Sequence, residues 1–169
     1  NKGDMTSQAM ITCSGAEIRG NVLLGYGAVE GIVIRDALRS RIVSNIIHFC
    51  STGILIEVAP GLPTAEIYYN TIVENREGIE YTEANALRIV GNLIVNNNTY
   101  GIHHHCKGTF LNELTVDYNY VAGNRSGNFT TTLSSGQTVC HMPFQLAPGP
   151  HDQTAASFNT AWFVDALGD

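Results

Sequence analysis

The chain has 169 residues, of which 44% are hydrophobic, enough for the buried core of a single domain over residues 1–169. Only 14% are charged, and 15 acidic residues against 9 Lys and Arg give a net charge of −6. We therefore expect no nucleic-acid partner, because neutralising phosphates requires a basic surface. The 17 Gly and 15 Asn residues favour turns, so many short strands are expected instead of a helical bundle.

The sequence repeats a short pattern that ends in asparagine. The pattern occurs at residues 17–21, 41–45, 66–70, 88–92 and 115–119. The final asparagines of these segments lie 24, 25, 22 and 27 residues apart. A second pattern, Gly-Ile, starts at Gly31, Gly53, Gly78 and Gly101. Each unit is too short for a strand-helix-strand crossover, and its apolar positions alternate with a period of two, so each unit is expected to consist of strands.

Units of this length predict turns of a parallel β-helix, in which three short strands pair with the next turn about 4.8 Å away. In chain order, we expect a partial first turn within residues 1–15, regular turns over residues 16–128, and a loop-rich tail with a last strand over residues 129–169. The repeated asparagine suits a left-handed corner, and stacked asparagine side chains can form a ladder along the axis. Ordinary hairpin turns in a β-sandwich are the alternative.

The segments Asn45–Ile56, Asn70–Tyr81 and Asn92–His104, with the ending at residues 162–169, resemble the parallel β-helix proteins of the pectate-lyase-like superfamily. The resemblance implies a right-handed single-stranded parallel β-helix of about five to six turns, in which the Gly-Ile sheet lines a sugar-binding groove. In that superfamily the ending continues into another strand, so we expect this chain to be part of a larger protein. The paired-aspartate motifs of polygalacturonases and the Arg-x-Pro-x-x-Arg pattern of pectate lyases are absent from the sequence.

Alternation along the Gly-Ile strands separates inward from outward side chains. The inward set is Ile32, Ile54, Ile79 and Ile102, followed by Ile34, Ile56, Tyr81 and His104. The outward set is Val33, Leu55, Glu80 and His103, followed by Arg35, Glu57, Thr82 and His105. Because parallel turns place equivalent residues about 5 Å apart, Glu80 is expected beside His103, and Arg35 beside Glu57.

The expected pair of Glu80 and His103 predicts general acid-base chemistry, because a carboxylate sets the tautomer of a histidine and raises its basicity. In a glycan-cleaving lyase or hydrolase, Glu80 would be the acid-base carboxylate, with Glu57 or Glu83 as the second carboxylate. The substrate-binding candidates are Arg35, Thr82 and His105. The same side chains could instead be ordinary polar residues of a solvated sheet face.

A metal site is the other chemical prediction for this face. Glu80, His103 and His105 form a candidate ligand set for a divalent ion, with zinc or copper more natural than calcium. Calcium could instead bind to loop carboxylates and carbonyl groups, although the sequence contains no EF-hand and no Gly-Gly-x-Gly-x-Asp repeat. No sequence motif specifies a cofactor.

The four cysteines form no Cys-x-x-Cys pair, so the usual zinc-ribbon and thioredoxin-like motifs are excluded. A disulfide between Cys106 and Cys140 is favoured, because it would fasten the tail to the regular turns. Four buried free thiols are the alternative.

The leading functional prediction is a secreted, periplasmic or cell-surface domain that binds or cleaves a polysaccharide or oligosaccharide along the Gly-Ile sheet. No apolar segment is long enough to span a membrane. Exposed tyrosines could also stack on sugar rings. The tyrosines considered are Tyr68, Tyr69, Tyr100, Tyr118 and Tyr120. The alternative is a non-catalytic structural or adhesive β-helix segment of a surface protein or fibre, which would self-associate end to end.

Overall fold

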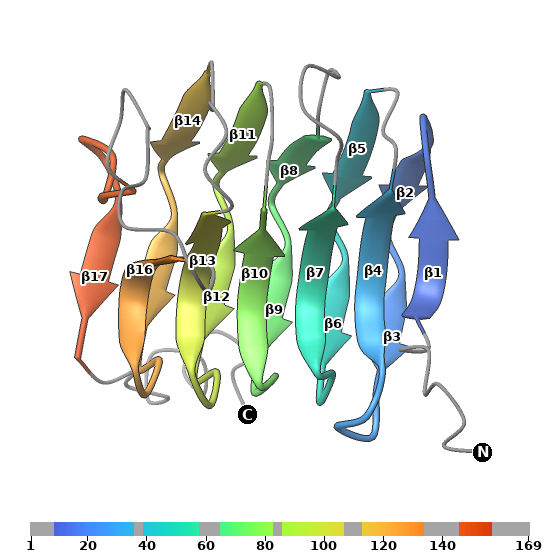
Figure 1. Ribbon diagram of the computed structural model, residues 1–169, viewed down its shortest axis with the longest axis horizontal. Helices are drawn as coiled ribbons and strands as arrows, with labels where there is room; N and C mark the ends of the chain where they lie inside the picture. Colours follow the sequence, from blue (N-terminus) through green and yellow to red (C-terminus); the bar gives the residue numbers. More distant parts are fainter. Residues whose placement is uncertain are drawn as a thin grey trace, which may run out of the picture.

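The computed structural model describes residues 9–35, 39–57, 65–82, 86–106, 113–133 and 146–156. Within these ranges the chain forms 17 β-strands and no helix, so no described segment could cross a membrane as a helix. The strands assemble into three parallel sheets that run along a common axis (Figure 1). The predicted all-β parallel β-helix is therefore confirmed.

The chain visits the three sheets in turn, and each strand pairs in parallel with its equivalent in the neighbouring turn. Sheet A contains β1 (Ala9–Cys13), β4 (Glu30–Arg35), β7 (Thr52–Glu57), β10 (Glu77–Tyr81), β13 (Tyr100–Cys106) and β16 (Gly127–Leu133). Sheet B contains β2 (Glu17–Arg19), β5 (Ser40–Val43), β8 (Ala65–Tyr68), β11 (Leu87–Val90) and β14 (Leu114–Asp117). Sheet C contains β3 (Val22–Leu24), β6 (Ile46–His48), β9 (Thr71–Val73), β12 (Leu93–Val95), β15 (Tyr120–Ala122) and β17 (Gln153–Ala155).

β16 (Gly127–Leu133) continues sheet A past residue 128, where the regular turns were expected to end. The partial first turn within residues 1–15 contains β1, and the tail contributes β17. The predicted strand at residues 162–169 lies outside the described residues.

The interior consists of stacked aliphatic columns. Ile54, Ile67 and Ile72, one from each sheet in successive strands, are fully buried. Every residue that alternation assigned to the interior of sheet A is buried as well. At the end of this column His104 stacks on Tyr81, with ring centroids 4.8 Å apart. Burial of these apolar side chains between the three sheets is the main source of stability.

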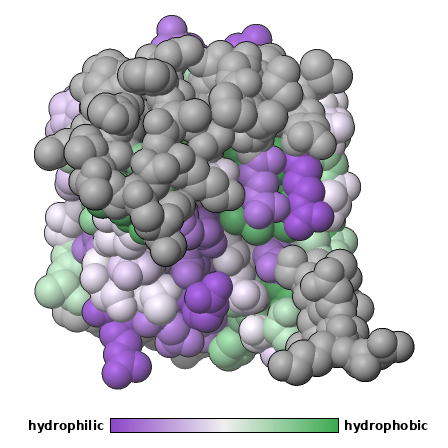
Figure 2. Space-filling model, in the orientation of Figure 1, coloured by the Kyte–Doolittle hydropathy of each residue, from purple (hydrophilic) through white to green (hydrophobic). Residues whose placement is uncertain are grey.

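The outer face of sheet A is less exposed than predicted. Val33, Leu55 and His103 are only 0%, 8% and 6% exposed, whereas a solvated face was expected. Apolar side chains on both faces are typical of parallel sheets that are covered on both sides. Over the described part of this face, hydrophilic patches lie beside smaller hydrophobic ones (Figure 2). The candidate residues on this face therefore lie in a partly enclosed environment.

The repeated asparagines form the predicted ladder at the corner between sheets B and C. The side-chain oxygen of Asn70 accepts hydrogen bonds from the main-chain N–H and the side-chain amide of Asn45, at 2.9 and 3.0 Å. The same two bonds link each of the other neighbouring pairs from Asn21 to Asn119. Asp152 ends the ladder by accepting from Asn119. Each side chain thus satisfies buried polar groups of its neighbouring turn.

The sequence predicted that the asparagine itself adopts the left-handed conformation at this corner. The structure places that conformation at the residue before the asparagine. Positive φ angles occur at Gly20, Ser44, Tyr69, Gly91 and Tyr118. This arrangement turns the chain one residue earlier, which directs the asparagine side chain inward, where it can bond along the axis. The tolerance of asparagine for left-handed angles is therefore not the reason for its presence here.

A second asparagine ladder, which the sequence analysis missed, lies at the corner between sheets C and A. Asn75, Asn97 and Asn124 are buried and bond along the axis as the first ladder does. Cys50 occupies the preceding place, where its main-chain N–H donates to Asn75 at 2.8 Å. Each of these asparagines follows a ladder asparagine by five residues, a spacing that was visible in the sequence.

The cysteines differ in state. Cys13 and Cys50 are free thiols, whereas Cys106 is disulfide-bonded. Cys140, its predicted partner, lies outside the described residues. The alternative of four free thiols is wrong.

Replacing Asn97 with Ala should lower the free energy of unfolding by about 3 kcal/mol, because the change leaves buried donors of Asn75 without an acceptor. Asn98→Ala is the matched control, since Asn98 is exposed. Urea denaturation followed by circular dichroism measures both. Equal losses in the two variants would contradict the structural role of the second ladder.

Candidate functional site

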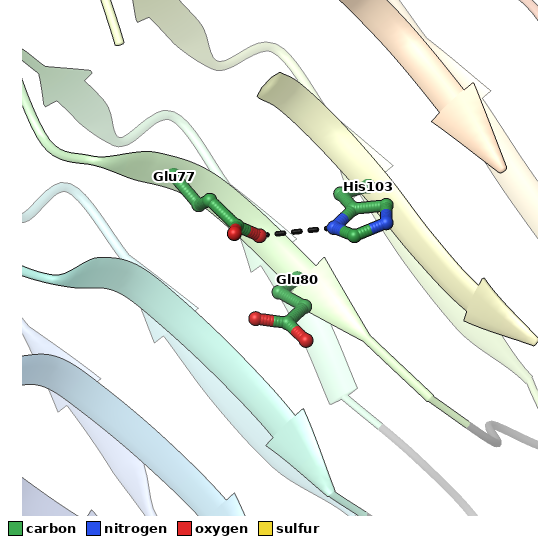
Figure 3. Close-up of side chains that lie close together, drawn as sticks. All are labelled: Glu77, Glu80 and His103. Carbon is green, nitrogen blue, oxygen red and sulfur yellow. Dashed lines mark hydrogen bonds and ion pairs between the residues drawn. The ribbon is translucent and has the colours of Figure 1, made fainter. Parts of the chain in front are cut away.

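Three acidic and histidine side chains whose ligand atoms lie close together form a cluster on the outer face of sheet A. Glu77 and Glu80 come from β10, and His103 comes from the adjacent strand β13 (Figure 3). One ligand atom of each residue lies within 4.8 Å of the other two. We call these three residues the carboxylate-histidine cluster.

Both nitrogens of the His103 ring have partners. Nδ1 lies 2.9 Å from a carboxylate oxygen of Glu77, and Nε2 lies 2.8 Å from the hydroxyl of Thr132 on β16. Arg76 donates to the other oxygen of Glu77 at 3.0 Å. The side chains of Glu77 and His103 are only 8% and 7% exposed, so this pair is nearly removed from water.

Glu77 escapes prediction from the sequence because strict alternation places it on the face opposite Glu80. Gly78 and Ile79 are both buried, which breaks the alternation between the two glutamates. A Cβ atom at Gly78 would collide with the carbonyl oxygen of Gly101 and would lie 2.8 Å from Ile94 Cγ2. Only glycine fits this close approach, and the irregular strand start directs Glu77 to the same face as Glu80.

The two glutamates have opposite pKa shifts. Burial and the neighbouring negative charge of Glu77 raise the pKa of Glu80. Burial acts to raise the pKa of Glu77 too, but the hydrogen bond and charge of His103 and the charge of Arg76 outweigh it and lower that pKa. Glu80 therefore keeps its proton to a higher pH than Glu77 does.

The structure brings some of the predicted residues together. Glu80 and His103 are paired across β10 and β13, at the register that was expected. His105 Nδ1 lies 3.9 Å from Glu80, and its ring centroid lies 6.0 Å from that of His103. Glu77 takes the place in the ligand cluster that His105 was predicted to fill. The catalytic and metal-binding roles of these residues stay predictions.

The other predicted residues, Arg35, Glu57 and Thr82, lie at or just after the ends of their sheet A strands, two residues beyond the positions equivalent to Glu80. Arg35 donates to Glu57 at 3.0 Å, and the two side chains are 49% and 40% exposed. The Thr82 hydroxyl donates to the main-chain oxygen of Ile56 at 3.4 Å. Glu83 lies outside the described residues. Glu77 is the carboxylate that lies within 4.8 Å of Glu80 and His103, and the role of Glu57 as a second carboxylate stays a prediction.

Residues 4–145 match a family described as periplasmic copper-binding protein (NosD). The chain belongs to the NosD family. The match agrees with the parallel β-helix that the sequence predicted, since NosD is a family of right-handed parallel β-helices. No curated protein and no solved structure matches the chain. The narrower assignment to the pectate-lyase-like superfamily stays a prediction.

The donor atoms of the cluster fit the metal that the NosD description names. Two carboxylate oxygens and one imidazole nitrogen suit copper(II) and zinc, which accept mixed nitrogen and oxygen ligands. Calcium prefers six to eight oxygen ligands, and copper(I) prefers sulfur, so the cluster suits neither of these ions well.

Glu80→Gln and Glu77→Gln are expected to change stability in opposite directions. A raised folded-state pKa destabilises the protein once the pH exceeds the unfolded value of about 4.3, so Glu80→Gln should raise the free energy of unfolding at pH 7. A lowered pKa stabilises over the same range, so Glu77→Gln should lower it. The difference for Glu80→Gln should shrink as the pH falls toward 4, whereas the difference for Glu77→Gln should shrink mainly at lower pH, which urea denaturation at several pH values measures.

Glu57→Gln is the control for these variants. Glu57 belongs to a half-exposed ion pair, so its replacement should change the free energy of unfolding by less than about 1 kcal/mol. Shifts of the same sign for Glu77→Gln and Glu80→Gln at pH 7 would refute the assigned difference between the two carboxyl groups.

Proposed function

We propose that this chain is a periplasmic β-helix domain that binds one divalent transition-metal ion, with copper(II) as the first candidate. The ligands would be the carboxylates of Glu77 and Glu80 and the Nδ1 atom of His103. The observation that carries the proposal is the convergence of these three donors within 4.8 Å on a face that is largely shielded from water. The family description supports the choice of copper and of the periplasm.

Thr132 would support the metal site from the last strand of sheet A. Its hydroxyl can accept a hydrogen bond from the Nε2–H group of His103, which leaves the Nδ1 lone pair for the ion. Arg76 would position the Glu77 carboxylate by donating to its other oxygen. The low exposure of His103 further strengthens the attraction between the ion and its ligands.

Protons compete with the metal at this site. Burial and the charge of Glu77 raise the pKa of Glu80. At a pH low enough for Glu80 to be protonated, a metal ion would have to displace that proton to bind. The affinity for the ion should therefore decrease in acid.

Isothermal titration of chelator-treated protein with Cu²⁺ and Zn²⁺ tests the proposal. We expect one ion per chain, and an affinity loss of at least about tenfold in His103→Ala and in the Glu77→Gln, Glu80→Gln double variant, since even second-shell changes cost about 10- to 100-fold. Electron paramagnetic resonance of the Cu²⁺ form should show one coordinated nitrogen, which disappears in His103→Ala.

His48→Ala is the matched control for the metal titration. His48 also contacts a carboxylate, with Nε2 2.8 Å from Glu74, but it belongs to no ligand cluster of three among the described residues. Binding that is unchanged in His103→Ala, or lost equally in His48→Ala, would exclude the proposed ligands.

Glycan binding or cleavage is the second candidate for the same face. Its support is the pair of carboxyl groups with opposite pKa shifts, because glycosidases use one protonated and one ionised carboxyl group. Glu80 would be the acid and Glu77 the second carboxylate, with Arg35, Thr82 and His105 as substrate contacts. The burial of His103 favours an ion over a sugar chain, so this function ranks second.

Mass spectrometry of oligosaccharides released from a polysaccharide panel tests cleavage. If the second candidate is correct, wild-type protein releases products and Glu80→Gln releases at least about 100-fold less, as expected for the loss of a general acid. Glu57→Gln should release the same products as wild type if Glu77 is the second carboxylate. Absence of both products and metal binding would favour the structural or adhesive segment.

A further inference from the structure

A second candidate site lies at the end of the solenoid opposite β1. There β14 lies beside the segment that leads into β17 (Figure 1). A groove of about 330 Å³ is open there between these two segments. Its lining residues are Leu114, Thr115, Val116, Asp117, Ala147, Pro148, Gly149 and Pro150. Tyr118 and His151 follow directly after Asp117 and Pro150, so both rings lie next to lining residues in the chain.

The rings of Tyr118 and His151 stack face to face, and we call this stacked pair the aromatic platform. Their centroids lie 4.3 Å apart and their planes differ by only 6°. Asp117 holds the imidazole, with Oδ2 2.9 Å from His151 Nδ1, and accepts the main-chain N–H groups of both platform residues through Oδ1. These three bonds leave one of about four carboxylate lone-pair positions for a further donor. The platform is therefore positioned before any ligand arrives.

Tyr118 stays exposed at a position that does not require an aromatic residue. Its φ angle is 57° and 61% of the residue is exposed. Gly20 and Gly91 hold the equivalent corner in other turns. A bulky residue in the left-handed region is unfavourable, so a tyrosine here requires a compensating contact, which Tyr118 finds in the ring of His151.

We infer that the platform and the groove bind a neutral sugar unit of an oligosaccharide. The apolar face of a pyranose ring would stack on Tyr118, while its hydroxyl groups would bond to Asp117 and to the Thr115 hydroxyl. The groove volume is at the lower end of the range for small-ligand sites. Among the described residues, its lining contains one carboxylate and no cationic side chain, which disfavours acidic sugars.

The surroundings favour a sugar over a protein partner. Stable protein interfaces bury about 800 Å² on each side and centre on clustered apolar residues. Among the described residues, most of the large exposed apolar side chains lie on or beside β3 and β6, away from Tyr118. This inference does not depend on the carboxylate-histidine cluster, which is on sheet A.

Titration of isotope-labelled protein with cellohexaose, xylohexaose and mannohexaose, followed by NMR, tests the inference, with hexagalacturonate as the acidic comparison. At least one neutral sugar should shift the signals of Tyr118 and His151. Tyr118→Gly should weaken binding by about tenfold, the equivalent of one aromatic stacking contact. Glycine accepts the left-handed angle, so this variant keeps the fold.

Tyr69→Gly is the matched control. Tyr69 holds the same corner position with a φ angle of 55° and is 66% exposed, but its ring lies against Gly91 instead of an imidazole. Sugar binding should be unchanged in this variant. It should also be unchanged in chelator-treated wild type, so that this test does not depend on whether the carboxylate-histidine cluster binds a metal ion. No shift with any neutral sugar, stronger binding of hexagalacturonate, or equal losses in both variants would overturn the inference.

Discussion

The structure depends on hydrogen bonding along the solenoid axis. Strands satisfy their own main-chain groups by pairing with the next turn, but the corners between strands cannot do so with main-chain groups alone. Asn45 and Asn75 show the solution at two corners, where a side-chain amide accepts from one turn and donates to the next. A left-handed residue before each asparagine makes room for this contact. The ladders therefore fix the register on which every other alignment depends.

The hydrogen bonds of the first ladder all run the same way along the axis, and this determines which residue can end the ladder. Every asparagine oxygen from Asn45 onward accepts from the turn before it, so the final position needs an acceptor and no further donor along the axis. Asp152 meets this requirement, because one oxygen accepts from Asn119 and the other accepts the main-chain N–H of Gly149. The carboxylate thus closes the ladder and at the same time holds the segment that forms one wall of the groove beside β14.

Residues that follow the repeat were predictable, and residues that depart from it were not. Alignment of the Gly-Ile pattern placed Glu80 beside His103 and Arg35 beside Glu57, because equivalent positions of successive turns pair with one another. Glu77 escaped prediction because the close approach at Gly78 breaks the period of two. The burial of the outer face of sheet A also escaped prediction, because it depends on packing beyond the strand pattern.

The charges of the carboxylate-histidine cluster would let the proposed metal site stay folded with or without an ion. Burial, and then repulsion between two carboxylates this close together, raise the pKa of Glu80, while His103 and Arg76 hold Glu77 in its charged form. A proton on Glu80 and a bound cation relieve the same repulsion. Because Nδ1 of His103 already faces Glu77, the proposed exchange of the Glu80 proton for a metal ion would require little movement of the strands. The rigid ladders therefore suit a site whose ligands are positioned in advance.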